Sequence, residues 1–368
     1  MDSCSPSPPL PGQVVLVLQG GGALGAYQLG VYQAMHEAGL EPDWVIGTSI
    51  GAINGAIIAG NAPQHRLDRL RQFWHRMEQN ALGFSAMPRA LANAVTIARG
   101  IPAFFEPNPA AWWNPDGRVG IERASYYHTA PLRATLDALV DFDYINQRHT
   151  RLMVGAVNAR NGAMRYFDSR KEPLAADHVM ASGALPPAFP AVRIDGEPYW
   201  DGGLYSNTPI EAVLDDEPRR SSVIFSVQVW NPDGSEPQSV LDVLDKYKEI
   251  QFASRAGNIE QQRRLHRLRH VIRQLALHLP EEVALSPEAR ELTAWGCGTT
   301  MHVVSLKAPR LGDEDHTKDI DFSAAGIRAR WQAGYDDAKR FIELRPWDRE
   351  IDPIEGIAIH ELPGGGQV

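Results

Sequence analysis

The feature that most constrains the fold is a strand, a glycine turn and a helix in direct succession, which occurs twice within the first sixty residues. The apolar run VVLVLQ at 14–19 leads into GGGALG at 20–25, and apolar residues at helical spacing follow. A second short run at 44–46 leads into GTSIG at 47–51, followed by the small-residue segment AINGAIIAG at 52–60. Short continuous apolar runs are typical of strands buried on both faces, and strand–helix alternation is typical of parallel sheets. The sequence therefore predicts a parallel α/β layer.

The rest of the chain continues this alternation. Helices are expected at 65–78, 175–183, 240–279 and 323–343, strands at 151–157, 164–167, 221–229 and 302–308, and a short hairpin through Gly196. Residues 80–115 are less regular and carry Phe104, Phe105, Trp112 and Trp113. Two interpretations stay open for this stretch: a mobile or lipid-facing cover over a site, or an irregular insertion that its aromatics pack onto the core.

Composition excludes several classes of protein. The formal net charge of −9 argues against a nucleic-acid partner, because affinity for phosphate backbones requires clustered Lys and Arg. The two cysteines, Cys4 and Cys297, do not suggest a disulfide framework, so we expect a cytoplasmic location. No secretory signal of the usual form and no run of about 18 apolar residues occurs, so membrane contact would be peripheral, at the inner face.

Ser49 is the candidate nucleophile. A serine hydroxyl needs a base within hydrogen-bond reach and a turn that lifts it clear of its neighbours, and the nucleophile elbow at Gly47 and Gly51 provides such a turn. The alternative interpretation is a helix start at which the Ser49 side chain caps a free N–H.

The glycine loop at 20–25 also has two interpretations. Its bare N–H groups can stabilise a developing oxyanion, but G-x-G-x-x-G after a strand is also the dinucleotide-binding fingerprint. A dinucleotide site needs an acidic residue at the end of the second strand. Glu41 and Asp43 precede that strand, so acyl transfer is favoured over NAD(P) binding.

Asp201 is the candidate base. It follows two aromatic residues and precedes Gly202 and Gly203, and burial in such a setting raises a carboxylate pKa and improves proton acceptance. An Asp that hydrogen-bonds its own backbone in a turn is an equally good interpretation of D-G-G.

Four blocks together resemble the patatin-like phospholipase family: LQGGGALGAYQLGV at 18–31, GTSIGAINGA at 47–56, ASGALPPAFPAV at 181–192 and WDGG at 200–203. The resemblance spans roughly residues 14–230. It implies a three-layer sandwich with a central, mostly parallel sheet flanked by helices, plus a C-terminal helical extension.

The same resemblance implies a function and a site. The expected activity is hydrolysis of lipid carboxylic esters by a Ser49–Asp201 dyad through an acyl-enzyme, without metal or cofactor. The oxyanion hole is expected at the backbone N–H groups of Gly20, Gly21 and Gly22. Many family members have Asp before the glycines and Arg or Lys before the last one, where this chain has Gln19 and Leu24.

The chain divides into four expected parts. A disordered tail covers 1–12, a patatin-like catalytic domain 13–230, a C-terminal extension packed on that domain 231–360, and a loose tail 361–368. The segment at 240–279 has leucines at alternating spacings of three and four, among several arginines. It is either an ordinary packed helix with a solvated basic face or a basic amphipathic helix on an anionic membrane.

Other functions stay open from the sequence. A short-chain or hydroxyacyl esterase would use the same residues, and an α/β-hydrolase would use a histidine such as His302 or His316 as the base. A lipid-binding protein without catalysis is the third alternative. Acyl-chain length, headgroup and oligomeric state carry no sequence signal.

Overall fold

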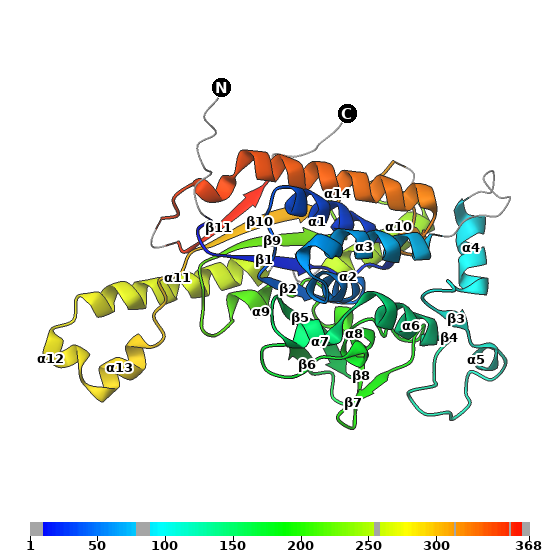
Figure 1. Ribbon diagram of the computed structural model, residues 1–368, viewed down its shortest axis with the longest axis horizontal. Coiled ribbons are helices and arrows are strands. Elements are labelled where there is room, and N and C mark those ends of the chain that lie inside the picture. The colour runs from blue at the N-terminus through cyan, green and yellow to red at the C-terminus, as the bar shows by residue number, and fades with distance from the viewer. Residues whose placement is uncertain (1–9, 79–88, 254–257, 313, 353–354, 363–368) are drawn as a thin grey trace.

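A mixed central sheet organises the chain (Figure 1). The computed structural model describes residues 10–78, 89–253, 258–312, 314–352 and 355–362. Nine described strands form the sheet in the order β11-β10-β9-β1-β2-β5-β8-β7, with β6 on the other side of β5. Six of them run parallel: β1 (Gln13–Leu18), β2 (Trp44–Gly47), β5 (Arg151–Asn158), β9 (Ser222–Gln228), β10 (Met301–Lys307) and β11 (Ile357–Glu361). The antiparallel strands are β6 (Met164–Asp168), β7 (Val192–Ile194) and β8 (Glu197–Asp201).

Helices cover both faces of this sheet. The larger layer contains α1 (Ala26–Glu37), α2 (Ile50–Ala59), α3 (Pro63–Met77), α6 (Ala130–Leu139), α7 (Phe142–Asn146), α8 (Ala176–Ser182) and α14 (Ala324–Leu344). The opposite face is covered by α9 (Ile210–Leu214). The side chains of β1 alternate between these two layers. Leu16 and Leu18 pack with the larger layer, whereas Val15 and Val17 pack with α9. The expected three-layer α/β architecture is confirmed, and the continuous apolar runs follow from burial on both faces.

The remaining elements lie around the sheet. They are α4 (Arg89–Arg99), β3 (Glu106–Pro107), α5 (Pro109–Trp113), β4 (Tyr127–His128), α10 (Val240–Ala253), α11 (Asn258–Leu277), α12 (Glu281–Ala284) and α13 (Pro287–Thr293). Short 3₁₀ turns occur at η1 (Gly22–Gly25), η2 (Gly202–Leu204), η3 (Lys318–Ile320) and η4 (Pro346–Asp348). None of the described helices is long and apolar enough to cross a membrane.

The sheet continues past residue 230, where the sequence suggests a domain boundary. Strands β10 and β11 extend it beyond β9, and α14 packs along α1. The sequence pattern does not predict β11, because the run IAIHE is short and Ile357 is the one buried residue of this edge strand. The part after 230 is therefore continuous with the fold that carries the glycine turns.

The expected helix at 240–279 differs from the ordinary packed helix that its leucine pattern suggests. It consists of α10 and α11, with 254–257 outside the described residues. On α11 the buried positions are His266, Arg269 and His270, whereas Leu268 and Leu275 are exposed. An ordinary packed helix would bury the leucines and expose the arginine, so that interpretation is wrong for α11.

Two glycines allow α1 and α14 to approach at backbone distance. A Cβ at Gly30 would lie 1.9 Å from the carbonyl oxygen of Trp331, and one at Gly334 would lie 2.0 Å from that of Tyr27. No real Cβ contact is that short, so any side chain there would push the helices apart.

We expect Gly334→Ala to lower the free energy of unfolding by about 1–3 kcal/mol, because overpacking a close interface forces backbone shifts. Thermal unfolding monitored by circular dichroism measures this change. Gly312→Ala is the control, since a Cβ at Gly312 meets nothing within 4 Å. Equal melting temperatures for the two variants would contradict the close-packing argument.

Candidate functional site

The turn after β2 holds Ser49 in a strained conformation. Its φ of 55° and ψ of −125° are unusual for a residue with a side chain. The flanking glycines make the turn possible: a Cβ at Gly47 would lie 2.3 Å from the carbonyl oxygen of Gly51, and a Cβ at Gly51 would lie 2.3 Å from that of Leu18. The Ser49 N–H donates to Ser182, and its side chain makes no capping bond to α2. The Ser49 side chain therefore does not cap α2, in contrast to the alternative interpretation.

Asp201 lies at the end of β8 and lines the same cavity as Ser49, whose hydroxyl lies close enough to lower the pKa of the Asp201 carboxyl. Its Oδ1 accepts from the Gly203 N–H at 2.7 Å, and its own N–H donates to the Ala184 carbonyl at 3.0 Å. The residue is 2 % exposed. Burial raises the pKa of Asp201 from 3.8 to about 7, although the Gly203 N–H and the nearby Ser49 hydroxyl oppose that rise.

Two amides of the glycine loop have no hydrogen-bond partner among the described residues, and their glycines line the cavity. The Gly20 N–H donates to the Asn207 carbonyl at 3.3 Å, so this expected oxyanion donor is already engaged. The amides of Gly21 and Gly22 make no hydrogen bond with any described residue. Gly22 has a φ of +56°, and a Cβ there would lie 2.3 Å from the carbonyl oxygen of Asp319. Only glycine fits this position.

Two residues that the sequence analysis missed hold the loop in place. The Gly20 carbonyl accepts hydrogen bonds from Asn207 Nδ2 at 3.0 Å and from Trp230 Nε1 at 2.9 Å. Asn207 Nδ2 also donates to the Phe252 carbonyl at 3.0 Å. Asn207 lies six residues after Asp201 in the run LYSNTP, and only its proximity to Asp201 could have drawn attention to it.

Gln19 stands where many family members have Asp, and it is a structural residue here. The side chain is fully buried. Its Oε1 accepts from the Val229 and Trp230 N–H groups at 2.6 and 2.9 Å, and its Nε2 donates to Thr208 Oγ1 at 2.7 Å. An amide can both donate and accept, which a carboxylate cannot do when ionised. Gln19 thus ties β1, β9 and the segment after Asp201 together below the glycine loop.

The cavity beside Ser49 has a volume of about 370 Å³ and an apolar lining. Its walls include Ile53, Phe104, Phe105, Phe189, Trp230 and Phe322. Phe104 and Phe105 are buried and pack against the ring of Phe189, whereas Trp112 and Trp113 are exposed. Phe104 and Phe105 therefore fit the interpretation of this irregular stretch as an insertion packed onto the core, whereas a mobile or lipid-facing cover stays a prediction. Residues 79–88 of this stretch lie outside the described residues.

Ion pairs fix the cavity wall formed by the C-terminal part. Lys248 Nζ lies 2.8 Å from Asp319 Oδ1, and Lys318 Nζ lies 2.5 Å from Glu249 Oε1. Glu249 is fully buried and also pairs with Arg310. These contacts join α10 to η3, whose Asp319 carbonyl lies against Gly22.

The residues needed by the alternative functions have other roles. His302 stacks on His360 across the β10–β11 pair, and Glu41 forms an ion pair with Arg66. Asp43 accepts the Val14 N–H at 2.8 Å. Asp201 lines the cavity beside Ser49, whereas neither His302 nor His316 does. A histidine base and a dinucleotide site therefore have no support in this geometry.

Leu24 and a second depression lie outside the site. Leu24 is buried next to Tyr27 and Ala333, so its position does not face the cavity beside Ser49.

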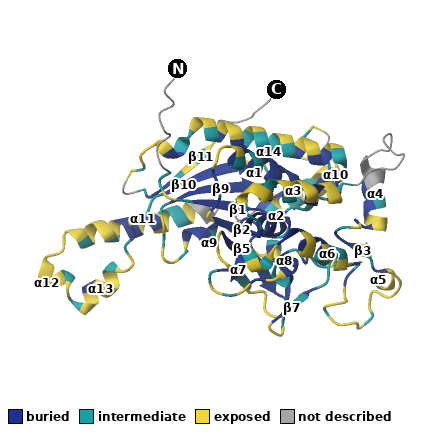
Figure 2. Cartoon of the chain, in the orientation of Figure 1, coloured by how far each residue is buried: buried dark blue, intermediate teal, exposed yellow. Residues whose placement is uncertain are grey.

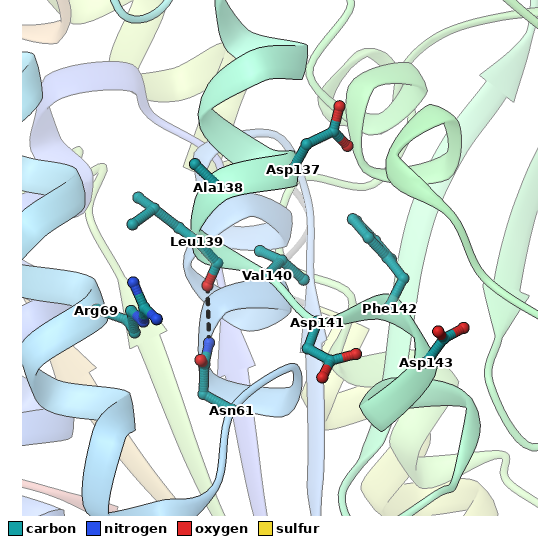
Figure 3. Close-up of a pocket in the computed structure, with 9 residues that line it drawn as sticks. All are labelled: Asn61, Arg69, Asp137, Ala138, Leu139, Val140, Asp141, Phe142 and Asp143. Atoms are coloured by element: carbon teal, nitrogen blue, oxygen red, sulfur yellow. Dashed lines mark hydrogen bonds between the residues drawn. The ribbon is translucent and has the colours of Figure 1, made fainter.

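Figure 3 shows the depression between α3 and α6, about 400 Å³ in volume, lined by Asn61, Arg69 and the run 137–143. Its Asp141 accepts the Tyr144 N–H at 2.9 Å and so caps α7. Among the described residues, no group of three or more His, Cys, Asp or Glu side chains is arranged to hold a metal ion.

A serine on a strained elbow, a hydrogen-bonded buried carboxylate and a bare glycine loop define the class of serine acyl hydrolases. Comparison with known families agrees with this class. The model of the patatin-like phospholipase family matches residues 16–214, and a second model, described as patatin phospholipase, matches residues 250–354. The chain belongs to the patatin-like phospholipase family.

Curated relatives share the same part of the chain. Lysophospholipase NTE1 of Candida glabrata is 28% identical over 239 residues, which is 65% of this chain and 12% of that protein. The NTE1 lysophospholipase of Saccharomyces cerevisiae is 27% identical over an equal length, again 12% of that protein. Mouse patatin-like phospholipase domain-containing protein 6 is 39% identical over 69 residues, which is 19% of this chain and 5% of that protein. This chain thus spans about an eighth of the first two relatives. The crystal structure of VipD from Legionella pneumophila aligns with 90% of this chain and 67% of its own, with a TM-score of 0.41 and 18% identity.

We expect Asp201→Asn to raise the melting temperature by a few degrees at pH 8 and by much less at pH 5. The folded-state pKa is near 7 and the ordinary value is 3.8, so folding favours the protonated form. Wild-type stability therefore falls as the pH rises from about 4 to 7, and Asn removes the buried charge that causes this loss. Differential scanning calorimetry at the two pH values measures the effect.

Asp168→Asn is the matched control, and we expect it to change the stability in the opposite direction. Asp168 is also buried, but the ion pair with Arg151 at 2.6 Å helps to hold its pKa below the usual range. Removing that charge should destabilise the protein at pH 8. Destabilisation of similar size in both variants would contradict a raised pKa at Asp201.

Proposed function

We propose that this chain is a lipid acyl hydrolase that cleaves carboxylic esters with Ser49 as nucleophile and Asp201 as general base. The observation that carries the proposal is a strained serine whose hydroxyl lies next to a buried carboxyl with a pKa near 7, with both residues in the wall of an apolar cavity. A base with a pKa close to the working pH combines a useful ionised fraction with good proton affinity.

The reaction follows from these groups. Asp201 takes the hydroxyl proton as Ser49 Oγ attacks the ester carbonyl, and the oxyanion lies against the N–H groups of Gly21 and Gly22. Collapse of this intermediate returns the proton to the leaving alcohol and leaves an acyl-enzyme. Asp201 then deprotonates a water that attacks the acyl carbonyl, and the proton passes back to Ser49 as the acid leaves. The strain at Ser49 keeps its Oγ clear of α2 through both steps.

A lipid acyl chain is the substrate group best supported by the cavity. Aromatic and aliphatic side chains line it, and a cavity of about 370 Å³ suits one extended chain better than a branched or charged group. The relatives named as lysophospholipases agree with a lipid ester. A short-chain or hydroxyacyl ester would leave most of this apolar surface without a partner and is the second candidate.

Contact with an anionic membrane through α11 has weaker support. Arg263 and Arg267 lie next to Glu355, and Arg269 pairs with Asp215, so much of the positive charge on this helix is neutralised within the protein. We keep the cytoplasmic location as a proposal, on the scarcity of cysteine.

Ser49→Ala and Asp201→Asn should each lower kcat/KM for a chromogenic ester by at least about a thousandfold, because the nucleophile and its base act as one unit. For the wild type, kcat/KM should fall about tenfold per pH unit below pH 7 and level off above it, because Asp201 must be ionised to accept a proton. His302→Asn is the control and should leave the rate unchanged. Near-normal turnover of Asp201→Asn, or failure of a fluorophosphonate probe to label Ser49, would contradict the proposed Ser49–Asp201 dyad.

Ala188→Leu should reduce kcat/KM for long-chain esters by about tenfold or more and leave butyrate esters nearly unaffected. Ala188 lines the cavity beside Phe189, and a larger side chain would shorten the space for the acyl chain. Ala138→Leu, on the exposed rim of the depression in Figure 3, is the matched control. Measuring esters of graded chain length tests the proposal, and a uniform loss across all lengths would argue against a chain-binding cavity.

A further inference from the structure

Helices α11, α12 and α13 form an arm that projects from the body of the protein, shown in yellow tones at the left of Figure 1. The body contacts of α11 are with α9 and β11. Most of the arm is exposed in Figure 2. At 20 residues, α11 is about 30 Å long, so the arm presents a long surface with little of its own core.

The arm exposes apolar side chains that a monomer would normally bury. Leu268 is 61 % exposed and Leu275 is 64 % exposed, and they belong to a seam with spacings of three and four that continues to Leu279. Leu285, Leu292 and Trp295 add to this surface beyond α11 and are all more than half exposed. Alternating spacings of three and four are the pattern of helices that pair along one seam. An apolar surface of this extent indicates an interaction site.

Charge along the arm is divided between its two ends. Near the body, Arg264 and Arg267 are exposed on α11, where each also lies within 4 Å of a carboxylate, that of Glu260 and that of Glu355 respectively. Near the tip, four carboxylates are exposed and form no ion pair with any described residue: Glu281, Glu282, Glu288 and Glu291. The two ends are therefore complementary to each other, but they lie too far apart on one straight helix to meet.

The position of the arm argues against a membrane as its partner. His266 and His270 hydrogen-bond the Thr299 carbonyl, two residues before β10 begins, so the arm leaves from the N-terminal edge of the parallel strands. Ser49 follows the C-terminal end of β2, at the opposite edge. A flat bilayer against the arm would lie away from the cavity, and the acidic tip would be repelled by anionic lipid.

We propose that the arm pairs with the arm of a second copy of this chain, antiparallel and around a two-fold axis. The leucine seam of each arm then buries the seam of the other. The acidic tip of each arm lies against the arginine-bearing end of the other arm, next to the body. A two-fold axis satisfies both ends at once, because each contact occurs twice. A parallel pair would bring the four carboxylates of one tip against those of the other.

Light scattering and sedimentation equilibrium on the full chain test the pairing. The wild type should have twice the chain mass of 40.6 kDa at micromolar concentration. Leu268→Glu with Leu275→Glu should give the single-chain mass and unchanged turnover of a soluble ester, because the arm is remote from Ser49. Leu344→Glu is the matched control: it is 65 % exposed at the end of α14, and its variant should stay a dimer. A wild type with single-chain mass at 100 µM overturns the proposal, as does anionic-vesicle binding that the double variant abolishes.

A charge exchange tests the antiparallel arrangement. Glu281→Lys with Glu282→Lys, and separately Arg264→Glu with Arg267→Glu, should each weaken self-association by about tenfold or more, because like charges then face each other. Mixing the two variants should restore the dimer as a heterodimer. The tip of each arm then meets an end of opposite charge next to the body of the partner. Two variants that associate with themselves as well as with each other would refute antiparallel pairing.

Discussion

The proposed chemistry depends on one feature, the closeness of the Ser49 hydroxyl to the buried carboxyl of Asp201. A serine hydroxyl is a poor nucleophile at neutral pH, and an exposed carboxylate with an ordinary pKa is a poor base. Burial changes the second of these, because it raises the pKa of Asp201 to about 7. The protein can keep such a carboxylate only where nearby groups hold it, and the Gly203 N–H and the β8 backbone do so. The reactive pair is thus part of the sheet edge rather than of a mobile loop.

The glycine loop depends on a different set of contacts. Its position comes from hydrogen bonds to the Gly20 carbonyl and from Gln19 below it, and these bonds extend to β9 and α10. The first glycine anchors the loop, because its amide donates to Asn207, whereas the amides of the next two glycines have no hydrogen-bond partner among the described residues. This arrangement separates the residue that fixes the loop from those proposed to hold the oxyanion. It also explains why an amide side chain can occupy the position before the glycines.

Much of the fold could be predicted from the sequence, because burial on both faces makes each central strand a continuous apolar run. The strand–turn–helix repeats identified β1, β2 and the elbow at Ser49, and D-G-G drew attention to Asp201. Asn207, Trp230 and Phe252 could not be found in this way, because they reach the loop through tertiary contacts from distant segments. The edge strand β11 and the exposed side of α11 were also beyond local pattern, since a leucine seam looks the same whether its partner is in the same chain or in another.

The order in which the cavity is assembled follows from the contacts of η3 and α10. The proposed nucleophile is residue 49, but the wall that closes the cavity includes Phe252, Ile320 and Phe322. During synthesis on the ribosome, the elbow and the glycine turns therefore emerge long before the chain can enclose an acyl group. A nascent chain ending near residue 230 would also leave β9 as an open sheet edge, because β10 pairs with it only later. The complete site therefore forms only after almost all of the chain has been synthesised. A shortened form that keeps only the glycine turns and D-G-G is a poor choice for a minimal esterase.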